Sequence, residues 1–256
     1  MTDPVQLAVD AALAAGRIQS DRADNISRID YKGDIDPVTE VDLLCEKEII
    51  SRIRTAFPDH EILAEESGQS NERHAWRWVI DPLDGTVNYA HGYPCYCVSI
   101  ALEHDGQVEV GVIYNPNLDE LFVAQRGKGA TLNGKPIRVS SEKNLKRSLL
   151  VTGFAYNVGE TENNNLDHFA NFAKECQAVR RPGSAAMDLC YVACGRFEGF
   201  WELNLHAWDY AAGWLLVTEA GGKVTRFDGA PFSMGDREIL ATNNLVDQSM
   251  IDVLSR

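Results

Sequence analysis

The sequence predicts a layered α/β protein, arranged as one large domain or as two closely packed halves. Its 256 residues are 45% apolar, which is enough to build a sizeable core. From Cys97 to about Val139, apolar runs separated by turn dipeptides indicate a meander of antiparallel strands. From about residue 141, strands alternate with helices instead. These two patterns favour stacked sheets and helices over a single βαβ winding.

Two helices and two short strands are expected before the meander. The segment "TDPVQLAVDAALAAG" at 2–16 begins with Asp3 as a candidate cap and Pro4 in the first turn, and apolar residues follow at helical spacing. A second helix is predicted from Glu40 to Ala56, because its apolar residues share one face and "FPD" ends it. "EILAEE" at 61–66 and "WRWVID" at 76–81 are predicted to be strands that end in acidic residues.

The second half is expected to contain three strands and four helices. "SLLVTGF" at 148–154, "KVTRFDG" at 223–229 and "EILATN" at 238–243 are the predicted strands. Helices are predicted near 166–176, at "SAAMDLCYVACG" (184–195), at "DYAAGWLLVTEAGG" (209–222) and at 246–255, and glycine ends two of them. No internal repeat or long linker is evident, so residues 1–256 are interpreted as a single domain with halves of about 1–140 and 141–256.

Charge and composition exclude several classes of function. A formal net charge of −14 argues against a nucleic-acid groove, because binding a polyanion depends on clustered Lys and Arg. The six cysteines form no CxxC pair and match no common zinc spacing, so we expect reduced thiols in a cytoplasmic protein. The N-terminus lacks a basic, apolar signal, and no apolar stretch approaches 18 residues, so we expect no membrane partner.

The segment "WVIDPLDGTVNY" at 78–89 carries two aspartates just after an apolar strand. Aspartyl-phosphate enzymes use D-x-D-G-T, but here Pro82 stands two residues before Asp84 and offers no nucleophile. The spacing D-x-x-D-G-T instead allows Asp81, Asp84 and the carbonyl of Leu83 to face one side, where they would suit Mg²⁺. The amides that follow, at residues 85 and 86, are free to face a phosphate.

Other segments supply further acids, and each acid has a structural alternative. Glu65 and Glu66 follow a predicted strand and would be solvated if they had no role. Asp209 precedes an apolar helical run and could be an ordinary helix cap. "DPVTEVD" contributes Asp36, Thr39 and Asp42, of which the last two match a capping box. The sequence alone leaves both interpretations open for each residue.

Four segments together resemble the inositol monophosphatase family: "DPVTEVD", "AEES", "DPLDGTVNYAHGYP" and "WDYAAGWLLVTEAGG", in this order. The resemblance extends over essentially the whole chain, including "RGKGATLNGKPIRVS" and "RRPGSAAMDLCYVACGRFEGFWE". It implies a layered α-β-α-β-α sandwich and a magnesium-dependent, lithium-sensitive phosphomonoesterase. It also implies a homodimer whose substrate is a small phosphate monoester, most closely an inositol 1-phosphate.

The resemblance assigns roles to particular residues. It implies two to three Mg²⁺ ions held by Glu65, Asp81, Leu83, Asp84 and Asp209. It implies that Thr86, paired with Asp42, orients the attacking water, which the metal activates, and that Glu65 takes part in catalysis. The implied substrate contacts are Asp84, Gly85, Thr86, Ser184, Ala185 and Glu202, and the further candidates are Lys32, Thr39 and Glu66.

Two alternatives to inositol phosphate hydrolysis stay open. The first is a sister specificity on the same machinery, for histidinol phosphate, fructose 1,6-bisphosphate or adenosine 3',5'-bisphosphate. "DGTVNYAHGYP" is more similar to inositol phosphatases than to the "DGTKEF" type that acts on adenosine bisphosphate. The second is a mainly non-catalytic, partner-binding role, because some bacterial relatives associate with the transcription machinery. The presence of all four acids Glu65, Asp81, Asp84 and Asp209 favours the enzyme.

Overall fold

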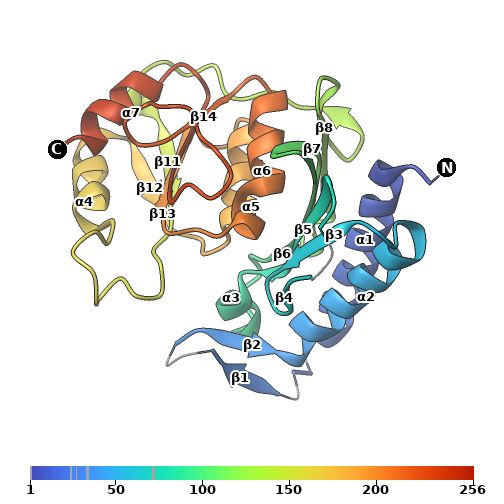
Figure 1. Cartoon of the computed structure of the whole chain (residues 1–256). Coiled ribbons are helices and arrows are strands. Elements are labelled where there is room, and N and C mark those ends of the chain that lie inside the picture. The colour runs from blue at the N-terminus through green and yellow to red at the C-terminus, as the bar shows by residue number, and fades with distance from the viewer. Residues whose placement is uncertain (1, 24, 27, 33–34, 71–72) are drawn as a thin grey trace.

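Five alternating layers of helices and sheets make up the protein (Figure 1). The structure is a computed structural model that describes residues 2–23, 25–26, 28–32, 35–70 and 73–256. In the described chain, helices α1 (Pro4–Arg22) and α2 (Glu40–Ala56) form the first layer, and α5 (Ala185–Ala193) and α6 (Ala207–Glu219) lie between the two larger sheets. Helices α4 (Leu166–Glu175) and α7 (Asp247–Leu254) form the outermost layer. The predicted α-β-α-β-α sandwich is confirmed.

The first half of the chain builds an eight-stranded sheet. Its strands in spatial order are β10 (Lys135–Pro136), β9 (Gly129–Leu132), β8 (Glu120–Gln125), β7 (Gln107–Asn115), β6 (Cys97–His104), β5 (Trp76–Asp84), β3 (Glu61–Ala64) and β4 (Gly68–Gln69). Only β3 and β5 pair in parallel. The run from β6 to β10 is the antiparallel meander that the turn dipeptides predict.

The second half builds a five-stranded mixed sheet. Its spatial order is β12 (Ala178–Arg180), β11 (Leu149–Thr152), β13 (Gly199–Leu203), β15 (Glu238–Thr242) and β14 (Lys223–Thr225). Strand β11 pairs in parallel with both of its neighbours, whereas β15 runs antiparallel to β13 and β14. A separate hairpin of β1 (Ile29–Tyr31) and β2 (Pro37–Thr39), a short helix α3 (Thr86–Ala90) and a 3-10 turn (Leu145–Arg147) complete the described elements.

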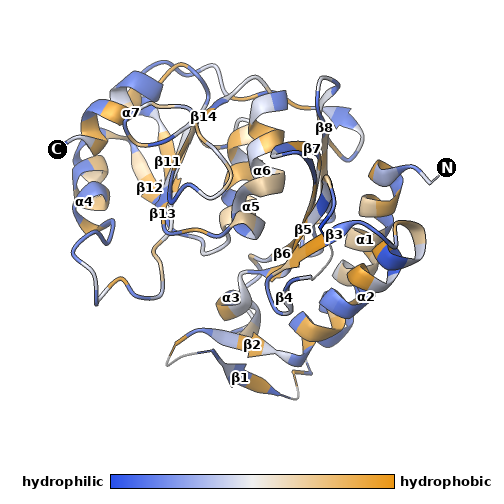
Figure 2. Ribbon diagram, viewed as in Figure 1, coloured by the Kyte–Doolittle hydropathy of each residue, from blue (hydrophilic) through white to orange (hydrophobic). Residues whose placement is uncertain are grey.

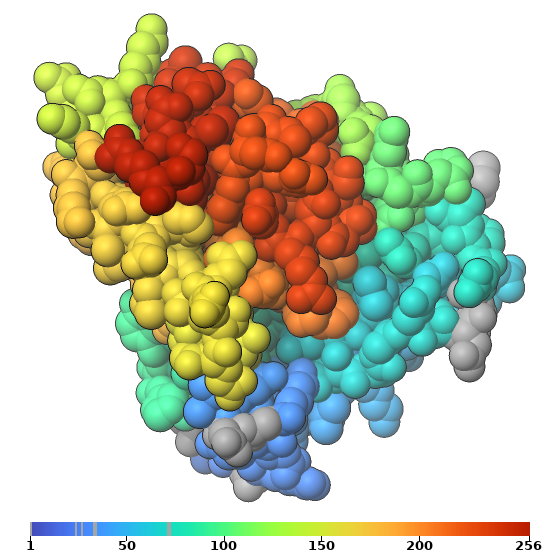
Figure 3. Space-filling view, turned by 60° about the vertical axis from the view of Figure 1, so that its left-hand side comes forward, coloured from blue at the N-terminus to red at the C-terminus, as the bar shows by residue number. Residues whose placement is uncertain are grey.

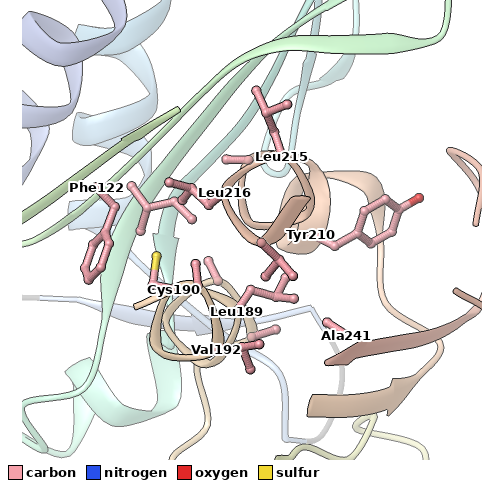
Figure 4. Packing of buried hydrophobic residues seen from close by; sticks show 14 of the residues in the cluster. Phe122, Leu189, Cys190, Val192, Tyr210, Leu215, Leu216 and Ala241 are labelled. Carbon is pink, nitrogen blue, oxygen red and sulfur yellow. The ribbon is translucent and has the colours of Figure 1, made fainter. Parts of the chain in front are cut away.

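Apolar packing explains the layer order. Helix α1 turns a row of buried alanines toward α2 and the large sheet, and such small side chains allow close approach. Between the sheets, Leu189 of α5 and Leu216 of α6 pack among residues of both sheets, with Phe122 on one side and Ala241 on the other (Figure 4). Figure 2 shows this concentration of hydrophobic residues on α5, α6 and the strands.

Several elements differ from the expectations. Helix α1 continues six residues past Gly16, and the strand expected at 223–229 ends at Thr225, where the chain turns through Gly229. Helix α3 and strand β13 were not predicted. Strand β13 is buried on both faces, so its sequence "GFWEL" lacks the alternation that marks a half-exposed strand. No helix in the described part of the chain combines the length and apolarity needed to cross a membrane.

Candidate active site

A cavity of about 850 Å³ lies where the two halves meet. Its lining comes from the end of β5, from α3, from the N-termini of α5 and α6, from β13 and from the loop at 153–161. Seven acidic residues line it: Asp36, Glu65, Asp81, Asp84, Asp188, Glu202 and Asp209. In Figure 3 the yellow loop after β11 lies beside the blue β1–β2 region on this face of the molecule. Acids that are distant in the sequence therefore share one cavity.

Both aspartates of the D-x-x-D-G-T segment belong to strand β5, which continues three residues beyond its expected end at Asp81. Asp81 lies opposite Ser99 and Asp84 lies opposite Cys97, so three steps along β5 match two steps along β6. Residues three apart in a regular strand face opposite sides. The extra residue of this bulge is what allows both carboxylates to line the same cavity.

Gly85 turns the chain from β5 into helix α3. Its φ of 96° lies in the left-handed region, which disfavours residues with a side chain. A Cβ atom at this position would also lie 2.8 Å from the carbonyl oxygen of Cys95. The turn therefore requires glycine, and it places Thr86 at the start of α3, facing the cavity.

Asp84 joins the two halves of the molecule. Its Oδ2 accepts hydrogen bonds from Ser184 Oγ at 2.6 Å and from the amide of Ala186 at 2.8 Å, at the N-terminus of α5. Burial raises the pKa of Asp84, and these hydrogen bonds oppose that rise because they favour the charged form. Ser184 and Ala185, both expected to contact substrate, line the cavity at this point.

Thr86 and Asp42 meet although 44 residues separate them. Thr86 Oγ1 lies 3.0 Å from Asp42 Oδ1 and 3.0 Å from the carbonyl oxygen of Leu83. The other carboxylate oxygen of Asp42 accepts hydrogen bonds from the amide and the hydroxyl of Thr39, which is the N-cap of α2. The capping box is therefore present, and it orients the carboxylate that holds Thr86. Burial raises the pKa of Asp42.

Glu65 and Glu66 are not solvated acids, contrary to the structural alternative. Their side chains are 21% and 6% exposed, and Lys32 Nζ lies 2.9 Å from Glu65 Oε1 and 2.7 Å from Glu66 Oε1. Burial raises the pKa of Glu65 to about 7, against the opposing charge of Lys32. Burial alone would lower the pKa of Lys32, but its pairing with Glu65 and Glu66 raises it. The ammonium of Lys32 thus occupies a position that attracts cations.

Asp209 lies in the first turn of α6, at the third helical position after the N-cap His206, and lines the cavity. Its Oδ2 accepts a hydrogen bond from the amide of His206 at 2.6 Å, in a second capping box. Burial and then the charge of Asp84 raise the pKa of Asp209 well above its ordinary value, and the His206 amide opposes this rise. Asp209 is therefore not the helix cap of the structural alternative, although its side chain accepts from the amide of the N-cap His206.

The acidic cluster fits a cation by its chemistry and charge. Burial, followed by the charges of Glu65, Asp84 and Asp209, raises the pKa of Asp81 well above its ordinary value. Such a cluster cannot stay fully ionised without a compensating cation, and carboxylate and carbonyl oxygens are the ligands that Mg²⁺ prefers. Among the described residues, no three His, Cys, Asp or Glu side chains already form a group that could hold a metal ion. The cavity therefore suits a cation by the chemistry and charge of its acids, although their side chains do not already surround a metal position.

Glu202 lies on the other side of the cavity, on the buried strand β13. Burial raises its pKa to about 8, with a further rise from Asp84 and an opposing effect of Arg181. A Cβ atom on Gly153 would lie 2.3 Å from Glu202 Oε1, so this glycine leaves the space that the carboxyl group occupies. The placement agrees with the expected substrate contact.

Sequence reasoning missed several residues that line the cavity, among them Asp188 and Tyr156. Asp188 is 1% exposed, and its Oδ1 has no hydrogen-bond partner among the described residues. Burial and then the charge of Glu202 raise its pKa well above the ordinary value. An acid within the apolar run "SAAMDLCYVACG" is a signal that could have identified Asp188. Tyr156 stands in an irregular loop, where no pattern marks it.

The whole chain matches a known protein family. Residues 2–255 fit the model of the inositol monophosphatase family. The chain belongs to this family. It is 46% identical to an inositol-1-monophosphatase of Synechocystis, over 98% of this chain and 88% of that protein. It is 41% identical to the protein named Nus factor SuhB of Pseudomonas aeruginosa, over 99% and 96% of the two chains. The solved inositol monophosphatase of Anabaena superposes with a TM-score of 0.91 at 45% identity, covering 98% and 94%.

Proposed function

We propose that this protein is a magnesium-dependent phosphomonoesterase that releases inorganic phosphate from a myo-inositol phosphate. Membership of the inositol monophosphatase family supports a phosphatase. The observation that carries the finer proposal is the cavity itself, in which buried carboxylates and the Thr86–Asp42 pair lie opposite Glu202. A protein of net charge −14 needs bound cations at this point to attract a phosphate dianion.

In this proposal two to three Mg²⁺ ions are held by Glu65, Asp81, the carbonyl of Leu83, Asp84 and Asp209. Bound magnesium supplies Lewis-acid chemistry, which favours attack by water on phosphorus and stabilises the leaving oxygen. The chain itself orients the water. Asp42, held by Thr39, accepts from the Thr86 hydroxyl and so directs the lone pairs of Thr86 Oγ1 toward a water in the cavity.

The substrate is held from both halves. The amides of Gly85 and Thr86 are placed to face the phosphate, since both residues line the cavity at the start of α3. On the alcohol side, Glu202 offers an acceptor for a hydroxyl group, and Ser184 and Ala185 complete the wall next to Asp84. Lys32 and Glu66 act at the edge of this site, where their ion pair tunes the charge around Glu65.

The family and the fold leave room for a sister specificity, and we retain histidinol phosphate, fructose 1,6-bisphosphate and adenosine 3',5'-bisphosphate as alternatives. Relatives with the name Nus factor SuhB are about as similar to this chain as relatives with the name inositol-1-monophosphatase. A mainly non-catalytic role with a protein partner is therefore a second candidate. The cavity is lined by all four acids expected to hold metal, Glu65, Asp81, Asp84 and Asp209, and this favours the enzyme.

Four further properties belong to the same proposal. We infer that the chain acts as a single domain with halves of about 1–140 and 141–256, that it forms a homodimer, and that it works in the cytoplasm. We also infer that lithium inhibits it. The family resemblance supports the dimer and the lithium sensitivity. The six cysteines are free thiols, which agrees with a reducing compartment.

Phosphate release from myo-inositol 1-phosphate tests the proposal directly. The assay is run with and without Mg²⁺, beside L-histidinol phosphate, fructose 1,6-bisphosphate and adenosine 3',5'-bisphosphate. We expect Mg²⁺-dependent release with the highest kcat/KM for the inositol ester. A preference for another ester would keep the reaction type and change the substrate. Absence of Mg²⁺-dependent release from all four would refute the enzyme and direct attention to the SuhB-named relatives.

A further inference from the structure

One buried polar side chain outside the cavity contacts the strand that carries the aspartates. Gln19 lies on α1, in the first layer, and is 0% exposed. Its Nε2 donates to the carbonyl oxygen of Pro82 at 2.9 Å and lies 3.5 Å from that of Cys97. Because both neighbours are acceptors, the side-chain nitrogen must face them. Gln19 therefore reaches across 63 residues to the bulge of β5.

The bulge explains why an outside donor is needed. Between Asp81 and Asp84 the pairing of β5 with β6 shifts by one residue, so carbonyl groups at the shift lose their regular partners. Buried carbonyl oxygens without a partner are destabilising. The amide of Gln19 supplies the missing donor to Pro82 and, more weakly, to Cys97.

The same peptide unit connects Gln19 to Asp81. The carbonyl of Pro82 and the amide of Leu83 belong to one planar peptide group, in which the C=O and N–H point in opposite directions. The carbonyl accepts from Gln19, and the N–H donates to Asp81 Oδ1 at 3.0 Å. Holding one end of this plane fixes the direction of the other. The orientation of the Asp81 carboxylate therefore depends on Gln19.

We propose that Gln19 is a positioning residue for the metal site, which it orients through the Pro82–Leu83 peptide. The main chain of Gln19 is itself held, because the Tyr89 hydroxyl donates to the backbone carbonyl oxygen of Gln19 at 2.7 Å. Helix α1 thus supports the site from behind, and none of its residues lines the cavity. This inference rests on the proposed metal site.

Replacement of Gln19 by methionine tests the role, because methionine has a similar length and no donor. Binding of Mn²⁺ to the full-length variant is followed by electron paramagnetic resonance of the free ion, and Mg²⁺ activation is measured in parallel. We expect the dissociation constant for Mn²⁺ and the half-activating Mg²⁺ concentration each to rise about tenfold, as for other residues that orient metal ligands. The kcat at saturating Mg²⁺ should change by less than about twofold, since the carboxylates themselves are retained.

Two controls separate positioning from loss of stability. Gln6→Met makes the same replacement at an exposed position of α1, where the side-chain amide donates to Asp10. Ala12→Gly weakens the same helix from a buried position that makes no hydrogen bond to the bulge. Both should bind Mn²⁺ like the wild type. If either control weakens Mn²⁺ binding as much as Gln19→Met does, the positioning role is wrong.

The result also distinguishes this inference from the function on which it rests. Wild-type protein that neither binds Mn²⁺ nor shows Mg²⁺-dependent phosphate release would refute the metal site itself. Wild-type binding together with unchanged binding by Gln19→Met would refute only the role of Gln19. If Gln19→Met does not fold, Tyr89→Phe removes the hydroxyl that holds Gln19 and keeps the ring. It should weaken Mn²⁺ binding in the same direction, and unchanged affinity would overturn the proposal.

Discussion

Single carboxylates in this protein serve structure and chemistry together. Asp84 accepts hydrogen bonds from Ser184 and Ala186, and Asp42 accepts them from Thr39 while it holds Thr86. In both cases, at least one oxygen is fixed by the fold. A fixed carboxylate loses little conformational freedom when it binds a ligand. At the scale of residues, the site is therefore oriented by ordinary capping and hydrogen bonding.

Asp84→Asn should remove activity and keep the fold. The amide oxygen of asparagine can still accept from Ser184 and Ala186, but the negative charge is lost. We expect Mg²⁺-dependent phosphate release to fall by at least about 100-fold, with a midpoint of thermal unfolding close to that of the wild type. Asp167→Asn, at an exposed position of α4, is the matched control. Full activity of Asp84→Asn would contradict the assigned role.

Glu202 should make the metal-free protein less stable as the pH rises. Burial raises its folded-state pKa from 4.5 to about 8. Between these values the folded chain keeps a proton that the unfolded chain has released, so the free energy of unfolding falls with increasing pH. We expect a loss of about 3.5 kcal/mol, or roughly 7–14 °C in Tm, between about pH 5 and pH 8.

Calorimetry of the metal-free protein across this pH range measures the effect. Glu202→Gln removes the titrating group and should make the slope shallower. Glu162→Gln, on the exposed loop after β11, should leave the slope unchanged. An unfolding temperature of the wild type that increases steadily from pH 5 to pH 8 would show that the sign is wrong.

Element ends carry most of the site. The bulge at the end of β5 brings two aspartates to one side, the N-terminus of α5 binds Asp84, and the N-terminus of α6 presents Asp209. A helix N-terminus has unpaired N–H groups and a partial positive charge, which stabilise nearby carboxylates. The ends of these strands and helices therefore position the carboxylates of the site.

Thr39→Ala should weaken α2 and the site together. The mutation removes the acceptor for the amide of Val41, at 3.1 Å, and the donor to Asp42. Loss of such an N-cap costs about 1–2 kcal/mol, which urea denaturation would measure. Activity should also fall, because Asp42 then holds Thr86 less firmly. Thr39→Ser retains the hydroxyl and should behave like the wild type in both measurements; if it does not, the cap is not the cause.

The whole molecule depends on close packing between the two sheets. Helices α5 and α6 lie in the middle layer and join sheets built by different halves of the chain (Figure 1). Their contact is tight at Gly213, where a Cβ atom would lie 2.6 Å from Leu189 Cβ. Because the cavity lies between the halves, this layer also sets how far apart its two walls stand.

Gly213→Ala should therefore destabilise the protein despite the better helix propensity of alanine. Overpacking of this kind costs about 1–3 kcal/mol. A decrease in Tm, measured by calorimetry, is the expected result. Gly159→Ala provides the comparison, because a Cβ atom there meets nothing within 4 Å. Equal stability of Gly213→Ala and the wild type would show that α5 and α6 can separate without cost.

The sequence by itself determined the local patterns. The spacing of Asp81 and Asp84 argued against the aspartyl-phosphate mechanism, the caps Asp3 and Thr39 located the starts of α1 and α2, and the turn dipeptides located the meander. Each of these signals works over a few residues, where the covalent geometry of the chain fixes the neighbours. The order of the acidic segments also identified the family, which the match over residues 2–255 shows.

Only the tertiary structure decided which distant groups meet. Asp42 and Thr86, Asp84 and Ser184, and Gln19 and Pro82 are each brought together across 44 to 100 residues. No local pattern encodes such a pair, because it depends on how whole layers stack and on which side chains that stacking buries. For the same reason, no local sequence pattern led to the prediction that Asp188 and Tyr156 line the cavity. Burial, which raises the pKa values of Asp81, Asp84, Asp188, Glu202 and Asp209, is likewise a property of the assembled layers.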